Sequence, residues 1–134
     1  MATIDRELLI KRAVEAREQS YSPYSSFAVG AALLCADGTI FTGANIESSS
    51  YSPTVCAERV AFFSAVFEGK RDFLAIAVVG GKAGNKIDEF CAPCGVCRQV
   101  MSEFCNGDFE IILSNGKDEK VFTLDNLLPL RFSL

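Results

Sequence analysis

The chain has 134 residues, 49% of them hydrophobic, so it is long enough to bury a core, and we expect a single domain over residues 1–134. Its formal net charge is −4 and its isoelectric point is about 4.8, which leaves no basic surface for a nucleic-acid backbone or an anionic membrane. It contains no histidine, which excludes a Ser-His-Asp triad, a Cys-His protease pair and an HExxH zinc site.

Segments in the first half of the chain have the spacing of regular secondary structure: 5–19, the pair 27–35 and 39–46, and 55–67. In the first, Leu9, Ala13 and Ala16 recur at helical intervals, which predicts an amphipathic helix. In the second, two apolar runs flank Asp37-Gly38, a strong turn signal, which predicts a β-hairpin. The third is apolar on nearly every face and stops at a Glu-Gly pair, which predicts a buried helix.

The second half of the chain alternates predicted strands and helices: 73–79, 94–104, 109–114, 120–123 and 124–128. The run 73–79 is apolar throughout, which predicts a strand buried on both faces. Pro93 precedes the segment 94–104 and suits the first turn of a helix. Strand pairs followed by helix–strand alternation predict an α/β layered domain with a mixed sheet.

The amino-terminal residues are polar and lead directly into the first predicted helix, without the apolar core or the cleavage site of a signal peptide. No run in the chain approaches the roughly 20 apolar residues that span a bilayer. We therefore expect a cytoplasmic protein with no membrane partner. In that compartment the six cysteines stay reduced and are available as metal ligands.

Three of these cysteines lie in two short motifs, C-A-E and P-C-G-V-C. Cys94 and Cys97 are three residues apart and therefore face the same side of a helical turn. Together with Cys56 they offer zinc three thiolate ligands and leave its fourth tetrahedral position open for water. A zinc-bound water ionises near neutral pH, and Glu58 is a carboxylate that can transfer its proton. The motifs predict a catalytic zinc site.

Both motifs are also expected at the start of a helix. Cys56 and Glu58 are two residues apart, so their side chains reach one site only where Cys56 stands at the very start of a helix. The dipole of a helix N terminus favours thiolate over thiol. Three thiolates around Zn²⁺ leave a net negative charge, and Arg59 is the adjacent positive group. We predict that Arg59 donates hydrogen bonds to ligand sulfurs and tunes the metal.

Six motifs, spread over nearly the whole chain, carry a family resemblance: F-A-V-G-A-A at 27–32, G-A-N-I-E at 43–47, Y-S at 51–52, C-A-E-R at 56–59, P-C-G-V-C-R-Q at 93–99 and L-L-P-L-R-F at 127–132. In this combination and order the chain resembles the cytidine deaminases, in particular the small homotetrameric type with three cysteine ligands. The resemblance implies a three-layer α/β/α fold with a mixed five-stranded sheet and helices on both faces. It also implies one Zn²⁺ per subunit and a homotetramer whose subunits share active sites.

The resemblance further implies a reaction and roles for individual residues. Cytidine and 2′-deoxycytidine would be hydrolysed to uridine and 2′-deoxyuridine plus ammonia in pyrimidine salvage, with a zinc-bound hydroxide attacking C4 while Glu58 shuttles protons. Asn45 and Glu47 would bind the ribose hydroxyls, and Phe132 would reach the site of a neighbouring subunit. The residues implied to contact the substrate are Phe27, Asn45, Glu47, Tyr51, Ala57, Ala92 and Phe132.

Two alternatives stay open. A related zinc deaminase acting on a nucleoside antibiotic of the blasticidin S type, or on a polynucleotide, would keep the same metal chemistry. The acidic isoelectric point argues against a polynucleotide, because phosphate contacts need lysine and arginine, and Phe27, Asn45 and Glu47 favour an ordinary ribose. In the second alternative, Cys91 acts as a fourth sulfur ligand, which would close the metal site and make a non-catalytic Cys₄ module. That module would leave Glu58 without a role.

Overall fold

The computed structural model describes residues 2–134. Its strands are β1 (Phe27–Cys35), β2 (Ile40–Ala44), β3 (Phe73–Lys82), β4 (Glu110–Ser114) and β5 (Glu119–Thr123). Its helices are α1 (Arg6–Arg17), α2 (Ala57–Phe67), α3 (Gly95–Phe104) and α4 (Leu124–Leu127). The strands form one five-stranded sheet in the order β2-β1-β3-β4-β5. β3 and β4 are parallel and the other neighbours are antiparallel, so the sheet is mixed, as predicted.

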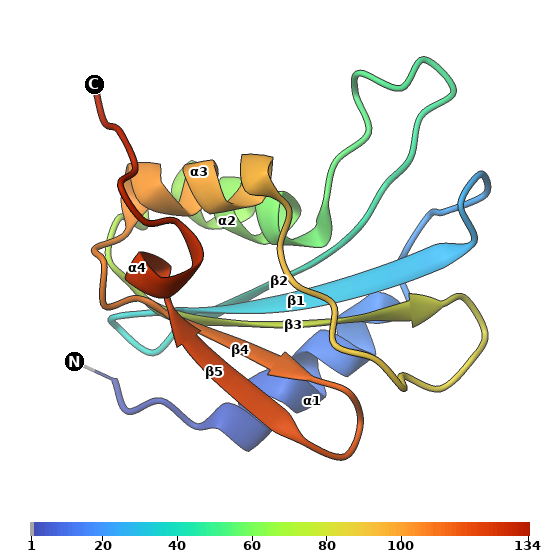
Figure 1. Ribbon diagram of the computed structural model, residues 1–134, viewed down its shortest axis with the longest axis horizontal. Helices are drawn as coiled ribbons and strands as arrows, with labels where there is room; N and C mark the ends of the chain where they lie inside the picture. The colour runs from blue at the N-terminus through green and yellow to red at the C-terminus, as the bar shows by residue number, and fades with distance from the viewer. Residues whose placement is uncertain (1) are drawn as a thin grey trace.

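The sheet lies between two layers of helices (Figure 1). α1 covers one face, where Leu9 and Ala13 share a buried cluster with Val79. The helices α2, α3 and α4 cover the other face, where Phe62 shares a second buried cluster with Ile76. β3 contributes to both clusters, as expected for a strand buried on both faces. The predicted three-layer α/β/α architecture is confirmed. Within residues 2–134, no helix has the length and apolar content that a membrane span requires.

Two glycines allow the helices to approach the sheet closely. A Cβ at Gly30 in β1 would lie 2.0 Å from the carbonyl oxygen of Ala13, and a Cβ at Gly43 in β2 would lie 2.3 Å from that of Ala57. Contacts this short are sterically forbidden, so both positions require glycine. Gly43 in this way seats the first turn of α2, which begins at the C-A-E motif, directly on the sheet.

The element boundaries lie within two residues of the predicted ones except at the end of β3. The prediction ended this strand at residue 79, but antiparallel pairing with β1 continues to the pair Phe27 and Lys82. Gly80 and Gly81 disfavour a strand by their local preference, and they end the apolar run. The neighbouring strand overrides that preference, because pairing and packing outweigh intrinsic propensity in a sheet.

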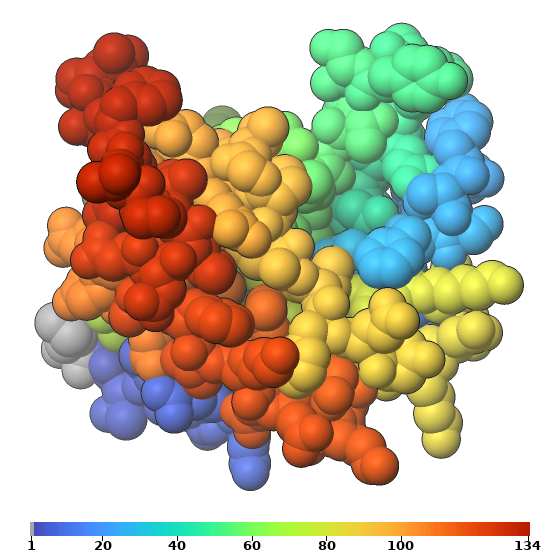
Figure 2. Space-filling view, viewed as in Figure 1, coloured from blue at the N-terminus to red at the C-terminus, as the bar shows by residue number. Residues whose placement is uncertain are grey.

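Two projections rise on the side of the molecule that α2 and α3 occupy (Figure 2). One is the segment between β2 and α2, and the other is the C-terminal segment after α4. The first rises beside the segment 20–26, which in turn adjoins the segment 83–94, at the end of the sheet where α2 and α3 begin (Figure 1). Backbone hydrogen bonds from Glu47 to Tyr21 (2.9 Å) and from Ala83 to Ser26 (2.7 Å) connect these segments.

Candidate metal centre

Three thiols converge where α2 and α3 begin. The Sγ atoms of Cys56 and Cys94 are 3.8 Å apart, and those of Cys94 and Cys97 are 3.5 Å apart. All three sulfurs lie within 4.8 Å of one another. Ligands at two corners of a tetrahedron, each about 2.3 Å from a zinc ion, are about 3.8 Å apart. The three thiols therefore fit a zinc ion with little rearrangement and leave one tetrahedral position open.

The local backbone explains why the thiols point to one place. Cys56 is the N-cap of α2 and Cys94 is the N-cap of α3, both with extended backbone conformation. Cys97 lies one turn into α3, and its amide donates a 3.5 Å hydrogen bond to the Cys94 sulfur. The first amides of a helix have no intrahelical acceptor and carry the positive end of the helix dipole. Two helix N termini thus face the same cluster, where they favour thiolates.

Arg59 is the cationic side chain at this cluster. Its Nη2 atom donates a 3.5 Å hydrogen bond to the Cys56 sulfur, and its Nε atom is buried without a hydrogen-bond partner among the described residues. The neighbouring Cys97 thiol and the hydrogen bond from Arg59 lower the pKa of Cys56 to about 5 in spite of its partial burial. Its interaction with Cys56, together with burial, raises the pKa of Cys97. Arg59 therefore favours the thiolate form of Cys56.

Glu58 lies in the first turn of α2, next to the cluster in sequence, and its side chain is buried, with 4% of the residue surface exposed. Burial raises its pKa to about 7, and the nearby negative charge of Cys56 adds to this shift. A carboxyl group with a pKa close to neutrality can both accept and return a proton at physiological pH. The arrangement therefore combines a metal site with a proton-transfer group.

Cys91 does not join the cluster. Among residues 2–134, the thiols that lie within 4.8 Å of one another are those of Cys56, Cys94 and Cys97. The Cys91 side chain packs instead beside Gly80 and near the ring of Phe27, since a Cβ placed on Gly80 would contact both. Burial raises the pKa of the Cys91 thiol to about 11.

Replacing Cys91 by serine should therefore leave the zinc content unchanged at one ion per chain. Atomic absorption of the purified variant, compared with the original protein, measures this directly. The reason is geometric, because a zinc ion held by the three clustered sulfurs has no contact with residue 91. Loss of zinc in this variant would contradict the three-sulfur site and support the closed Cys₄ alternative.

The predicted sugar-binding residues organise the segments beside the cluster. Asn45 donates from Nδ2 to the carbonyl oxygen of Phe27 (2.8 Å), and its Oδ1 accepts from the amide of Val29 (2.9 Å). Glu47 accepts hydrogen bonds from the Ser25 side chain and from two backbone amides of the segment 20–26, and these bonds lower its pKa. Sequence reasoning did not identify these partners, because nothing in the local pattern around residues 45–47 points to residues twenty positions away.

Two predicted substrate contacts lie on the projections. Tyr51 is 83% exposed on the segment between β2 and α2, and Phe132 is 65% exposed on the C-terminal segment. The carbonyl oxygen of Phe132 accepts a 3.4 Å hydrogen bond from Gln99 on the outer surface of α3. The two projections stand apart (Figure 2), so within one chain these aromatic residues do not close around a common ligand. Ala92 is exposed and Ala57 is buried.

This chain is similar to known deaminases. The family described as the cytidine and deoxycytidylate deaminase zinc-binding region matches residues 3–112. A cytidine deaminase from Sporosarcina psychrophila is 53% identical over 131 residues, which cover 97% of this chain and 93% of the relative. A crystal structure of cytidine deaminase from Burkholderia pseudomallei superimposes with a TM-score of 0.87 at 45% identity, over 96% of this chain and 100% of that one. A blasticidin-S deaminase from Bacillus cereus is 36% identical over 108 residues, or 78% of this chain and 76% of the relative.

Proposed function

Because the chain belongs to the cytidine and deoxycytidylate deaminase family, we propose that it hydrolyses the C4 amino group of cytidine and 2′-deoxycytidine. The products are uridine or 2′-deoxyuridine and ammonia. The observation that carries this proposal is the cluster of three thiols beside the buried carboxyl group of Glu58. A metal site with three protein ligands and an adjacent proton-transfer group is suited to hydrolysis rather than to a structural role.

Different side chains have different roles in the proposed reaction. Cys56, Cys94 and Cys97 hold the zinc ion, which when bound supplies the Lewis acidity that ionises a water near neutral pH. Glu58 takes a proton from the attacking water, delivers it to ring N3 and later passes a proton to the departing amine. One water enters and one ammonia leaves, so Glu58 ends in its starting protonation state. Its pKa near 7 suits transfer in both directions.

The substrate contacts follow from the groups that the fold presents. The Ala57 amide lies in the first turn of α2, where it has no intrahelical acceptor, and we assign it to the base oxygen O2. The Glu47 carboxylate and the second amide hydrogen of Asn45 suit the hydroxyl groups of a sugar, which need acceptors as well as donors. The further contacts in this proposal are Phe27 and Tyr51 with the nucleoside, and the carbonyl of Ala92 with the leaving amine.

The exposed surface of α2 and α3 supports a homotetramer with shared active sites. Phe63 and Phe67 in α2 are 49% and 88% exposed. Phe63 also lines a groove of about 460 Å³ together with α3 residues that include Val96 and Phe104. Large exposed apolar patches on a protein of this size indicate a contact surface. Association of four copies through this face would cover it and allow Phe132 of one subunit to reach the site of another.

We also assign the protein to pyrimidine salvage in the cytoplasm, and we treat residues 1–134 as one functional domain. A reducing compartment keeps the three ligand thiols available for the metal, because disulfides rarely persist there. The acidic chain offers no basic surface for a polynucleotide, which favours a free nucleoside as substrate.

A direct assay tests the proposal. Purified, zinc-loaded protein is incubated with cytidine or 2′-deoxycytidine, and uridine products and ammonia are measured with and without a zinc chelator. Blasticidin S in a parallel reaction tests the antibiotic alternative, and light scattering gives the subunit number. Release of uridine that the chelator abolishes is the expected result. A zinc-loaded protein that leaves both nucleosides unchanged would overturn the proposal.

Arg59→Gln should lower kcat by about 10- to 100-fold, with little effect on the thermal unfolding midpoint. The variant loses the hydrogen bond and the positive charge at the Cys56 sulfur, so the metal becomes a weaker Lewis acid. Steady-state kinetics and a thermal melt of the zinc-loaded variant measure both quantities. Arg71→Gln is the matched control, since Arg71 is exposed and hydrogen-bonds to the backbone carbonyls of Val66, in the last turn of α2, and Lys70. An unchanged kcat in Arg59→Gln would refute the tuning role.

A further inference from the structure

One guanidinium group bridges the metal-binding loop and the C-terminal part of the chain. Arg98 follows Cys97 on α3, and its side chain is half-buried. Its Nε atom donates a 2.8 Å hydrogen bond to the carbonyl oxygen of Pro93, the residue before Cys94. Its Nη1 atom donates a 2.8 Å hydrogen bond to the carbonyl oxygen of Leu127, the last residue of α4. The two acceptors are far apart in sequence and share no other side-chain donor in residues 2–134.

Each of these bonds supplies a donor to a backbone carbonyl for which the described residues show no other donor. The carbonyl of Pro93 belongs to the peptide that leads into Cys94, so its orientation sets the direction of the Cys94 thiol at the helix N-cap. The carbonyl of Leu127 lies in the last turn of a helix, where carbonyls lack an intrahelical donor. Arg98 supplies that donor. Bonds from a charged donor in a half-buried setting are stronger than neutral bonds at the surface.

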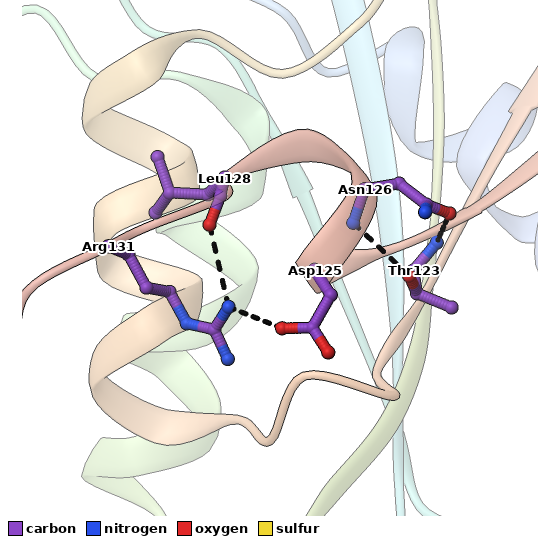
Figure 3. A network of polar contacts seen from close by, with 5 residues as sticks. All are labelled: Thr123, Asp125, Asn126, Leu128 and Arg131. Atoms are coloured by element: carbon purple, nitrogen blue, oxygen red, sulfur yellow. Dashed lines mark hydrogen bonds and ion pairs between the residues drawn. The ribbon is translucent and has the colours of Figure 1, made fainter.

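The segment beyond this attachment is held together as a local unit (Figure 3). Thr123 and Asn126 form a capping box at the start of α4. The Arg131 side chain hydrogen-bonds to the α4 region. Its Nη1 atom donates to the Asp125 carboxylate (2.6 Å) and to the carbonyl oxygen of Leu128 (3.4 Å). These contacts all lie within residues 123–131, so they shape the segment without connecting it to the metal site. Arg98 makes that connection.

We propose that Arg98 is a positioning residue that couples the zinc-binding loop to the C-terminal segment. Zinc on Cys94 holds the Pro93–Cys94 peptide in place, and Arg98 transmits that order to α4 and to the residues after it. The coupling is reciprocal, so an ordered α4 in turn helps to hold the zinc. The inference rests on the proposed function in one respect, namely that Cys94 is a zinc ligand.

The sequence alone gives little indication that Arg98 positions the zinc-binding loop. Arg98 follows the second cysteine of the P-C-G-V-C motif, a position that is equally suitable for an exposed arginine with no specific partner. Its significance comes from the two carbonyls that folding brings within reach. Gln99 is a useful contrast, because it contacts the C-terminal segment through the carbonyl of Phe132 and does not contact the metal-binding loop.

Arg98→Gln tests the coupling through two rates measured on the zinc-loaded, full-length protein. One is the rate at which a chromogenic chelator removes zinc, and the other is the rate at which carboxypeptidase shortens the chain from residue 134. We expect Arg98→Gln to accelerate both, zinc release by about tenfold. Gln99→Ala should accelerate only the shortening. Light scattering establishes that the compared proteins have the same subunit number.

A spectroscopic measurement separates positioning from a general loss of stability. With Co²⁺ in place of zinc, the thiolate-to-cobalt absorption band reports the geometry of the three sulfurs, and we expect Arg98→Gln to shift it. Arg98→Lys keeps the charge but has one ammonium for two carbonyls, so intermediate zinc release is expected. If Arg98→Gln does not fold, Arg98→Lys is the variant that is compared with the original protein. The proposal would be overturned if Arg98→Gln and Arg98→Lys matched the original protein in zinc release, in the absorption band and in chain shortening.

These measurements need no nucleoside, so they are independent of the substrate. A protein that binds no zinc at all would overturn the proposed function together with this inference. A protein that binds zinc and deaminates cytidine, but releases zinc at the same rate with and without Arg98, would overturn the coupling alone.

Discussion

Replacing Glu58 by glutamine is expected to lower kcat for cytidine by about 10²- to 10⁴-fold while zinc content and subunit number stay unchanged. The side chain is buried and stands in the first turn of α2, outside the three-sulfur cluster. Glutamine has almost the same shape but cannot accept and return a proton. The metal and the fold are therefore retained while the proton transfer is lost. Fixed-time assays of uridine release measure the difference in kcat between the variant and the original protein.

The matched control for this experiment is Glu68→Gln. Glu68 is the C-cap of the same helix and is exposed, so the same chemical change there should leave kcat unaltered. Metal analysis accompanies both variants. Near-normal turnover in Glu58→Gln would mean that the carboxyl group has no catalytic part, and it would favour the non-catalytic zinc module over the deaminase.

Cys97→Ser is expected to abolish activity to the detection limit and to reduce bound zinc to a small fraction of one ion per chain. Cys97 is buried, and its sulfur lies 3.5 Å from that of Cys94. A serine hydroxyl is a much poorer zinc ligand than a thiolate, because it remains protonated at neutral pH. Metal that binds the native state also stabilises it, so the thermal unfolding midpoint should fall by the amount that zinc contributes.

Two controls make this result specific to the metal. Cys105→Ser changes a half-buried thiol just after α3 that lies outside the cluster, and it should retain both zinc and activity. Chelation of the original protein should remove activity, and added Zn²⁺ should restore it. The same addition should not rescue Cys97→Ser. A Cys97→Ser variant with full zinc content and normal turnover would contradict the ligand assignment.

The helix starts illustrate what local pattern could predict. Ser52-Pro53-Thr54, shortly before Cys56, is typical of a turn, Pro93 before Cys94 suits the first turn of a helix, and a predicted helix follows each of them. In the structure α2 and α3 begin one residue after these cysteines, within two residues of the predicted starts at 55 and 94. Such signals are local, since turn residues and apolar periodicity act within a few residues of themselves. The extra residues of β3 were missed for the opposite reason, because their strand conformation depends on β1.

The contacts of Asn45 also could not be predicted from the local sequence. Its position in the G-A-N-I-E motif indicated a sugar-binding side chain, and the structure adds that its amide holds the backbone of Phe27 and Val29. A substitution at Asn45 would therefore disturb the segment around Phe27 as well as any contact with a ligand. Neither the identity of these partners nor their distances could be obtained from the residue types alone.

Residue types and short-range spacing were sufficient to predict the order of helices and strands, the mixed sheet, the three candidate zinc ligands and the neighbouring carboxyl group. These properties depend on chemistry and periodicity within a few residues. Folding alone decided that Cys56 meets Cys94 across 38 positions, that Cys91 stays outside the cluster, and that Arg98 joins two distant carbonyls. Contacts of this kind arise when the sheet aligns two helix N termini at one end, and separation along the chain carries no information about them.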